Sequence, residues 1–341
     1  MKKVIHLIPY DGIGGVETAA RSMAHYDQSE INFQINYIFS LLCTSRNRIA
    51  LFNPLPFLKA TRQILIDQPD ILIVSLWRSC IVGLLVKMGY PAVRLVLFLH
   101  LPKDVHFPDW ILTRLTAKLA HQVWADSEAT LACRISGLPG TGKVISFVTH
   151  RLAAYKNKMV KPIFVFWGRI HSQKRLERSL TIFADIHTVY PKSHFIVIGP
   201  DGGELTRIRE VAGSIGITNA VRFVGEKNFS EIKELAQNAF FYLQTSDLEG
   251  MAMSVLEAMQ LGLVPVVTPV GEIASYCRHQ ENSLLITSDR QAVDDILGLL
   301  NNSRMYEQLR ERAIATWTDK PLYSESVVQA CLEICSEGGA C

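Results

Sequence analysis

The sequence predicts an α/β protein with two successive, doubly wound parallel sheets. Short apolar runs rich in Val and Ile alternate with helical patterns along most of the 341 residues, as in parallel α/β folds. The alternation breaks over a basic, less patterned stretch from Thr149 to Lys161 and then resumes. A chain of this length suits two domains of ordinary size.

The first domain is expected over residues 1–155. Its strand candidates are the apolar runs Val4–Ile8, Phe33–Phe39, Ile71–Val74, Leu95–Leu99, Gln122–Ala125 and Val144–Phe147. Helical patterns fit between them, near residues 15–26, 56–67, 77–88, 109–120 and 127–135.

The second domain is expected over residues 156–316. Its strand candidates are Ile163–Trp167, Phe195–Ile198, Val221–Phe223, Phe240–Leu243 and Val264–Val267. Helical patterns lie at 174–188, 203–215, 229–237 and 253–261, and three more follow at 289–300, 303–315 and 321–335.

Charge is unevenly distributed along the chain. Residues 1–155 carry 16 Lys and Arg against 10 Asp and Glu, whereas the remainder carries 19 against 22. The more basic first half favours an anionic membrane face or a phosphate-bearing acceptor. Scattered solubilising charges are the alternative.

Targeting signals are not evident in the sequence. The start, M-K-K-V-I-H-L-I-P-Y, has an apolar run too short for a signal peptide, and no stretch reaches the length of a membrane span. The seven cysteines are dispersed, with no C-x-x-C and no zinc spacing, which fits a reducing compartment. We therefore expect a cytoplasmic protein that meets a membrane only from its surface, and we disfavour an exported binding protein.

Two acidic residues eight positions apart, Glu249 and Glu257, are candidate ligand-binding carboxylates. Glu249 falls in the loop after a strand, and Glu257 falls one turn into the next helix. Both can face the crevice outside the carboxyl ends of the strands, where open α/β sheets bind ligands. Between them, Gly250-Met251-Ala252-Met253-Ser254 leads into a helix N-terminus whose free N–H groups suit a phosphate. The alternative is a pair of solvated surface charges.

A basic element, Gly168-Arg169-Ile170-His171-Ser172-Gln173-Lys174, follows the first strand of the second domain. Arg169 is expected at the strand end and Lys174 at the start of the next helix, so both cations can converge on one diphosphate. A planar guanidinium and a compact ammonium together stabilise such a leaving group. Ordinary surface charges are the alternative.

These motifs resemble those of the retaining nucleotide-sugar glycosyltransferases of the GT-B fold, in particular glycosyltransferase family 4. The E-x7-E segment is followed by A-M-x-x-G-x-x-P-V-V, and the basic element matches G-R-x-x-x-x-K. The resemblance implies two Rossmann-like domains that face a cleft, the first binding the acceptor and the second the donor. It also implies that a C-terminal helix within 317–341 packs back on the first domain.

The resemblance further implies roles in the donor site. Arg169 and Lys174 would meet the diphosphate, Glu249 the transferred sugar, and Glu257 the ribose hydroxyls. Gly199 would line the donor pocket, with a plain turn as the alternative, and Val224 lies in an F-x-G strand end like the one that cradles the base. Backbone groups would hold phosphate or sugar oxygens along Gly250, Met251, Ala252, Met253 and Ser254.

In the first domain, Gly14 and Gly15 follow the first strand and resemble the family loop that meets the donor phosphate. A tight turn is the alternative, and the full G-x-G-x-x-G pattern of dinucleotide oxidoreductases is absent. His100 stands where the family commonly has a histidine that touches the sugar, but Leu101-Pro102 after it departs from the pattern, and His106 is a rival. Asp126-Ser127 resembles an acceptor-side element and equally suits a helix N-cap.

The sequence therefore predicts a hexosyltransferase that uses a nucleoside-diphosphate sugar and a glycan acceptor, lipid-linked, in bacterial surface polysaccharide (lipopolysaccharide) biosynthesis. No D-x-D triplet occurs, so we predict metal-independent chemistry without a cofactor, and no nucleic-acid partner. Peripheral contact with the inner face of the cytoplasmic membrane is expected, since aromatic and basic residues mix around Trp77-Arg78 and from His106 to Lys118. A sugar-nucleotide epimerase and a non-catalytic sugar-nucleotide or glycan-binding protein are the alternatives.

Overall fold

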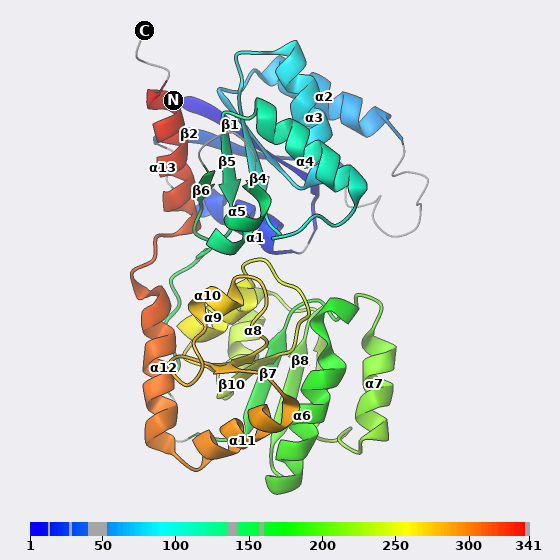
Figure 1. Cartoon of the computed structure of the whole chain (residues 1–341), viewed down its shortest axis with the longest axis vertical. Coiled ribbons are helices and arrows are strands. Elements are labelled where there is room, and N and C mark those ends of the chain that lie inside the picture. Colours follow the sequence, from blue (N-terminus) through cyan, green and yellow to red (C-terminus); the bar gives the residue numbers. More distant parts are fainter. Residues whose placement is uncertain (13, 27–28, 40–52, 136–141, 157–159, 338–341) are drawn as a thin grey trace. The chain divides into compact units, whose positions relative to one another are not determined.

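The structure is a computed structural model that describes residues 1–12, 14–26, 29–39, 53–135, 142–156 and 160–337. The chain forms two compact units, each with its own sheet (Figure 1). Unit 1 comprises residues 1–150 and 321–341, and unit 2 comprises residues 151–320. The divisions thus fall at 150 and 320, where the sequence suggested 155 and 316.

Unit 1 contains a six-stranded parallel sheet in the order β2-β1-β3-β4-β5-β6. Its strands are β1 (Lys2–Tyr10), β2 (Ile31–Phe39), β3 (Ile71–Ser75), β4 (Arg94–Leu99), β5 (Gln122–Ala125) and β6 (Gly142–Val144). Its described helices are α1 (Gly15–Ser22), the 3₁₀ turn η1 (Met23–His25), α2 (Leu55–Asp67), α3 (Trp77–Gly89), α4 (Phe107–Leu119), α5 (Glu128–Ile135) and α13 (Tyr323–Ser336).

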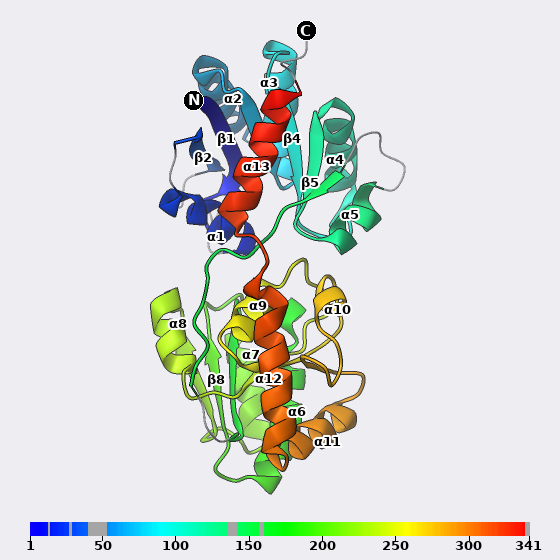
Figure 2. The ribbon, with the colours of Figure 1, turned by 90° about the vertical axis from the view of Figure 1, so that its left-hand side faces the viewer.

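The helices of unit 1 cover both faces of its sheet. The connections through α2, α3 and α4 step along the sheet in one direction, so right-handed crossovers place these helices on one face. There α3 packs against both α2 and α4 (Figure 1). The connection through α1 runs the other way, and α13 packs against α1 on the opposite face (Figure 2). The strands are therefore buried from both sides, which explains their nearly continuous apolar runs.

The C-terminal helix α13 is part of unit 1. Leu322 forms a parallel bridge with Val148, and the Tyr323 N–H donates to the Val148 carbonyl at 2.8 Å. Along the helix, Lys143 forms an ion pair with Glu333. Helix α13 is thereby attached to the first sheet.

Unit 2 contains a second six-stranded parallel sheet in the order β12-β11-β10-β7-β8-β9. Its strands are β7 (Ile163–Trp167), β8 (His194–Ile198), β9 (Val221–Gly225), β10 (Phe241–Gln244), β11 (Val264–Val267) and β12 (Leu284–Leu285). Its described helices are η4 (Ser172–Lys174, a 3₁₀ turn), α6 (Leu176–Val189), α7 (Leu205–Ser214), α8 (Phe229–Ala236), α9 (Met253–Gln260), α10 (Ile273–Tyr276), α11 (Asp289–Leu300) and α12 (Ser303–Thr318).

The strand order of unit 2 places a topological switch point between β7 and β10. The chain moves outward from β7 to β8 and β9, then returns to β10 and continues outward on the other side. The connections after β7 and β10 therefore run to helices on opposite faces of the sheet, and their loops lie at the carboxyl ends of the strands, where this fold binds ligands. The two predicted charged motifs occupy these two loops.

The two α/β sheets confirm the predicted fold class, with differences at element ends. The sixth strand lies at Gly142–Val144 instead of Val144–Phe147. Ile145 and Phe147, whose apolar side chains suggested a strand, are buried beyond its end. The helix expected from residue 174 begins at Leu176, because Arg175 has left-handed backbone (φ 46°) after the turn η4. Two short elements, α10 and β12, were missed.

Candidate active site

The loops that follow β7 and β10 are joined by two hydrogen bonds. The Asp247 N–H donates to the Gln173 carbonyl at 3.0 Å, and the Gln173 side-chain amide donates to the Leu248 carbonyl at 2.5 Å. The two loops carry one cationic and one anionic motif, so these bonds hold opposite charges side by side at the switch point.

Lys174 and Glu249 form the central ion pair of the site. The Lys174 Nζ lies 2.6 Å from the Glu249 Oε1, and the two side chains are 16% and 8% exposed. Glu249 also accepts a hydrogen bond from the Gln244 Nε2 at 3.2 Å. The carboxylate is thus shielded from water but neutralised by a cation and a neutral donor.

Gln244 connects Glu249 to the interior of unit 2. Its side-chain oxygen accepts from the Tyr242 hydroxyl at 2.8 Å and lies 3.2 Å from the Ser254 hydroxyl, which also donates to it. Its nitrogen therefore has to face Glu249, since the reversed amide would set an oxygen against a carboxylate. Gln244 is fully buried, so this orientation is held on all sides.

Glu257 lies in the first turns of α9, and its Oε2 accepts from the indole N–H of Trp167 at 2.8 Å. Burial raises the pKa of Glu257 to about 7, against the lowering effect of the Trp167 hydrogen bond. The carbonyl of Trp167 lies 3.1 Å from the Tyr242 hydroxyl. A chain of polar contacts thus runs from Glu257 through Trp167, Tyr242 and Gln244 to Glu249.

Arg169 is the available cation of the basic element. Its side chain is exposed and extends along Gly202, where an added Cβ would lie 3.0 Å from the Arg169 Cγ. Within the described part of the chain, Arg169 has no hydrogen-bond or ion-pair partner. Its five donors are therefore free to meet an anion.

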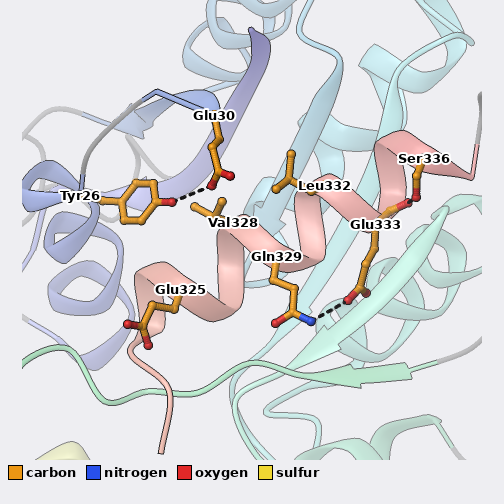
Figure 3. A pocket seen from close by; sticks show the side chains of 8 residues that line it. All are labelled: Tyr26, Glu30, Glu325, Val328, Gln329, Leu332, Glu333 and Ser336. Carbon is orange, nitrogen blue, oxygen red and sulfur yellow. Dashed lines mark hydrogen bonds between the residues drawn. The ribbon is translucent and has the colours of Figure 1, made fainter.

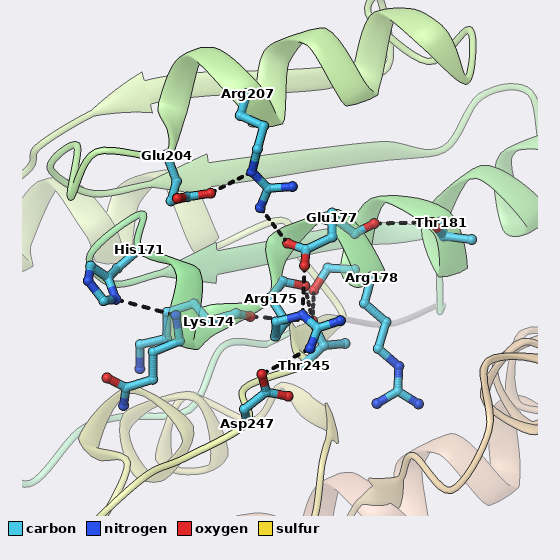
Figure 4. Close-up of polar contacts among 12 residues, drawn as sticks. His171, Lys174, Arg175, Glu177, Arg178, Thr181, Glu204, Arg207, Thr245 and Asp247 are labelled. Atoms are coloured by element: carbon cyan, nitrogen blue, oxygen red, sulfur yellow. Dashed lines mark hydrogen bonds and ion pairs between the residues drawn. The ribbon is translucent and has the colours of Figure 1, made fainter. Parts of the chain in front are cut away.

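The other arginines near this loop are neutralised, and Figure 4 shows the pairs of Arg175 and Arg207. Glu177 lies between Arg175, at 2.6 Å, and Arg207, at 3.1 Å, and Arg175 also pairs with Asp247 at 3.0 Å. Arg178 pairs with Asp289 at 2.6 Å. These ion pairs distinguish Arg169 from its neighbours in sequence.

The segment from Gly250 to Ser254 leads into α9 as predicted. Ala252 has left-handed backbone (φ 54°, ψ 64°) and turns the chain into the helix. Met251 and Ala252 are buried. The first N–H groups of a helix lack intrahelical acceptors, so the start of α9 offers donors to an oxyanion.

A second loop supports this segment from behind. Gly271 has φ 55°, and an added Cβ would lie 2.1 Å from the Glu249 carbonyl oxygen. The Glu272 N–H donates to the Gly250 carbonyl at 3.1 Å, and the Tyr276 hydroxyl donates to the Met251 carbonyl at 3.0 Å. The loop after β11 therefore fixes the backbone on which Glu249 is placed.

Gly199 and Val224 lie at the carboxyl ends of β8 and β9. Gly199 has φ 145°, and an added Cβ would lie 1.9 Å from the carbonyl oxygen of Gly168, so close approach of two loops requires a glycine there. Val224 is the extra residue where the pairing of β8 with β9 shifts register. Their contact with a donor remains a prediction.

The predicted residues of unit 1 are Gly14, Gly15 and His100, which follow β1 and β4. Gly14 precedes α1 with extended backbone (φ −156°), which any residue can adopt, and Gly15 is the first residue of α1. The neighbouring loop is held by Arg21, which donates to Asp11 and to the Gly12 carbonyl. The structure thus places Gly14 and Gly15 at the end of β1 without showing a need for glycine at Gly14.

His100 follows β4 with both ring nitrogens turned inward. Its Nε2 lies 2.9 Å from the Ser75 hydroxyl, which is also 2.7 Å from the Nε2 of His6. Burial lowers the pKa of both histidines to about 3, and His6 adds to the effect on His100. Both rings are therefore neutral, and a sugar contact through a nitrogen of His100 would require the ring to move. The rival, His106, is the exposed N-cap of α4 and accepts from the Asp109 N–H.

A shallow pocket of about 590 Å³ lies in unit 1 beside α13 (Figure 3). It is lined by Tyr26, Glu30, Glu325, Val328, Gln329, Leu332, Glu333 and Ser336. Its described lining residues include three carboxylates and no cation, so it does not suit a diphosphate.

The described residues hold neither a cluster of metal ligands nor a helix suited to span a membrane. No three His, Cys, Asp or Glu side chains in that part of the chain gather as metal ligands. Among its helices, none is long and apolar enough to cross a membrane.

Sequence reasoning missed the residues that support the two glutamates. Trp167, Tyr242, Gln244, Gly271 and Tyr276 come from the two strands β7 and β10, the loop after β11 and the short helix α10. One signal was available. Tyr242 and Gln244 are polar residues at alternate positions of an otherwise apolar strand, and a buried polar group without a partner is costly.

Comparison with known proteins agrees with this geometry. Residues 151–316 match the model of the family "Glycosyl transferases group 1". The D-inositol 3-phosphate glycosyltransferase of Corynebacterium urealyticum is 29% identical over 176 residues, which are 50% of this chain and 37% of that protein. The GDP-mannose:cellobiosyl-diphosphopolyprenol alpha-mannosyltransferase of Komagataeibacter xylinus is 27% identical over 128 residues, 37% of this chain and 32% of that protein.

The chain thus spans less than half the length of these curated relatives. Among solved structures, Anabaena Alr3699/HepE in complex with UDP and glucose superposes with a TM-score of 0.78 and 17% identity, covering 99% of this chain and 100% of that one. This likeness shows the fold. Residues 151–316 therefore match the group 1 glycosyl transferases, within a chain whose two α/β sheets have the GT-B fold.

Proposed function

We propose that this chain is a retaining glycosyltransferase that moves a hexose from a nucleoside-diphosphate sugar to a glycan acceptor. The observation that carries the proposal is the charge arrangement at the switch point of unit 2. Arg169, whose guanidinium pairs with no described residue, stands on the same loop as Lys174, whose ammonium is held by Glu249. The proposal is further supported by the family match over this unit.

The proposed chemistry begins with exchange of partners. The donor diphosphate forms ion pairs with Arg169 and Lys174. Lys174 thereby leaves Glu249, whose carboxylate can then accept a hydrogen bond from a sugar hydroxyl. Glu257 accepts from the ribose hydroxyls beside its Trp167 bond. The sugar is thus bound through hydroxyls and the leaving group through cations.

Transfer then proceeds on one face of the sugar. The bond from the anomeric carbon to the phosphate oxygen breaks as the bond to the acceptor oxygen forms on the same side. The acceptor proton passes to the departing phosphate oxygen. Arg169 and Lys174 stabilise the charge that develops on the diphosphate, so we propose that no metal ion or cofactor is required.

The finer assignments rest on resemblance. The sequence motifs resemble those of glycosyltransferase family 4. HepE binds UDP and glucose, and the Komagataeibacter relative acts on a diphosphopolyprenol-linked sugar, as their names state. These names support a nucleoside-diphosphate hexose as donor and a lipid-linked glycan as acceptor. We propose a place in bacterial surface polysaccharide synthesis, at the inner face of the cytoplasmic membrane.

A ligand screen followed by a transfer assay tests the proposal. Nucleoside diphosphates and their sugars are first ranked by the rise in melting temperature that each produces. Transfer of the best sugar to lipid-linked glycans is then measured for the wild type, for Arg169→Ala and for Arg290→Ala, an exposed arginine of α11. We expect Arg169→Ala to lower turnover at least about 100-fold and Arg290→Ala to match the wild type.

Other outcomes would redirect the assignment. Interconversion of nucleotide sugars without any acceptor would identify an epimerase. Tight donor binding with no turnover on any glycan would identify a binding protein. An Arg169→Ala protein with undiminished transfer would refute the role of the basic loop.

A further inference from the structure

The exposed large apolar side chains of the described chain concentrate on unit 1. Only Val189 and Ile215 of those found in the described residues lie in unit 2. Five belong to one element and its approach, and they are Val105, Phe107, Trp110, Leu115 and Leu119. Contiguous apolar surface of this kind marks an interaction site.

These residues lie on the exposed half of α4. At 3.6 residues per turn, Phe107, Trp110, Leu115 and Leu119 spread over roughly 180° of the helix circumference, with Trp110 at one margin and Leu119 at the other. This exposed half is aromatic at its N-terminal end, where Phe107 is 69% and Trp110 42% exposed. Their rings stack at 5.8 Å with an angle of 12°, forming a continuous flat apolar tip.

Cations stand among these apolar side chains. Lys103 precedes α4, Lys118 lies near its end, and the Arg114 guanidinium lies 4.7 Å from the centre of the Trp110 ring. Lys103 and Lys118 form no ion pair with another described residue, whereas Arg114 pairs with Asp104 at 3.2 Å. The one acidic residue of α4, Asp109, is buried. We call this surface, with Val105 and Lys103, the α4 face.

The α4 face is held rigidly from beneath. The buried Arg134 lies 2.9 Å from Asp104 and 3.5 Å from Asp109, and it donates to the Thr113 hydroxyl at 3.2 Å. Asp109 in turn accepts from the Val105 N–H at 2.9 Å. These contacts fix the loop before α4 so that its apolar side chains face outward.

A second helix of the same layer repeats the pattern. Leu55, Leu58 and Ile66 are exposed on α2, with the cations Lys59 and Arg62 on the same side of the helix. Since α3 packs against both α2 and α4, the two exposed helix faces belong to one helical layer of unit 1 (Figure 1). Two amphipathic helices that expose apolar and cationic side chains together suit a broad, flat partner better than a small ligand.

We propose that the α4 face docks unit 1 on an anionic lipid surface. Aromatic rings insert at the boundary between headgroups and acyl chains, and the lysines contact anionic headgroups. The choice of a lipid surface over a protein rests on the proposed function, because a lipid-linked acceptor is presented at such a surface. The charge of the α4 face also complements an anionic bilayer.

Vesicle sedimentation tests the docking surface. The full chain is mixed with vesicles of phosphatidylcholine alone or with 30 mol% phosphatidylglycerol, and the bound fraction is measured. We expect clear binding to the anionic vesicles. Phe107→Ser/Trp110→Ser should lower the partition coefficient at least about tenfold, and Lys103→Glu/Lys118→Glu should lower binding to anionic vesicles roughly fivefold per charge.

Matched controls separate docking from folding and from catalysis. Val189→Ser/Ile215→Ser removes two exposed apolar residues from unit 2 and should leave binding unchanged. Each variant should keep the wild-type melting temperature and its shift with the best donor nucleotide. Wild-type protein that stays in the supernatant, or a Phe107/Trp110 variant that binds normally, overturns the inference. So does a concentration-dependent dimer that the Phe107/Trp110 variant abolishes. Vesicle binding without sugar transfer would instead refute the proposed function alone.

Discussion

The Lys174 ammonium lies 2.6 Å from the Glu249 carboxylate, so the proposed leaving-group cation and the proposed sugar-binding anion neutralise each other in the free protein. This pair joins the two loops of the switch point. A diphosphate can compete for Lys174 because it carries more negative charge than one carboxylate. In the free site, Lys174 and Glu249 are therefore both paired. Ligand binding exchanges the Lys174–Glu249 ion pair for one between Lys174 and the diphosphate.

Breaking this pair from one side should destabilise unit 2. Lys174→Met leaves Glu249 buried beside one neutral donor, Gln244, and we expect a loss of about 2–4 kcal/mol in the free energy of unfolding. Lys174→Met/Glu249→Gln removes both charges and should recover most of that loss. Neither variant should transfer sugar at more than about 1% of the wild-type rate. Urea unfolding and the transfer assay measure the two effects separately. A double variant as unstable as Lys174→Met would contradict a coupled pair.

Gln244 is a positioning residue, because its fixed amide orientation presents a donor to Glu249. Gln244→Leu should cost about 1–3 kcal/mol of stability, since the Ser254 hydroxyl loses its acceptor, Glu249 loses its amide donor, and the Tyr242 hydroxyl keeps only the Trp167 carbonyl. It should also lower kcat more than it raises KM for the donor, because Glu249 loses its alignment. Tyr242→Phe is the matched control: it removes one hydroxyl but leaves the Gln244–Glu249 bond. Equal kinetic damage from both variants would argue against positioning through the amide.

The fold could be predicted because its determinants are local. Apolar runs bounded by turns identify buried strands such as β1 and β11, and their alternation with helices implies parallel sheets. Elements without such a pattern were missed: α10 has four residues and β12 has two. Arg175 adopts left-handed backbone, which moved the start of α6 beyond Lys174.

The charged residues of the candidate site could also be proposed from spacing, but their partners could not. Nothing in the sequence indicates that Lys174 pairs with Glu249 across 75 residues, or that Trp167 reaches Glu257 across 90. Those contacts depend on which strands become neighbours. His100 shows the same limit, since its ring is held inward by Ser75, a residue from the neighbouring strand β3.

Glu257 should make the protein less stable as pH rises. Its pKa is about 7 in the folded protein against an ordinary value of 4.5. Between these values the folded state holds a proton that the unfolded state has released, so the free energy of unfolding falls with increasing pH. Glu257→Gln keeps an acceptor for Trp167 and lacks this titration. The free energy of unfolding of Glu257→Gln, relative to that of the wild type, should therefore rise by on the order of 2–3 kcal/mol between pH 4.5 and pH 8.

Unfolding by urea at several pH values checks this expectation, with the donor nucleotide absent. The same variant should bind the donor more weakly, because an amide offers the ribose hydroxyls one acceptor oxygen instead of two. A stability difference that does not change with pH would show that Glu257 titrates normally.

Replacing Ala252 by glycine should stabilise the protein. Its φ of 54° and ψ of 64° lie in the left-handed region, which costs an L-residue roughly 1–2 kcal/mol but is free for glycine. Ala252→Gly loses part of this gain to the greater entropy of the unfolded chain and a small buried methyl group. We expect a net stabilisation of about 0.5–1 kcal/mol in urea unfolding. Ala315→Gly, at an exposed position inside α12, is the control and should destabilise by about 1 kcal/mol. If both glycines destabilise equally, the backbone at residue 252 is not left-handed in solution, and the entry into α9 that carries the proposed oxyanion donors differs from the one described.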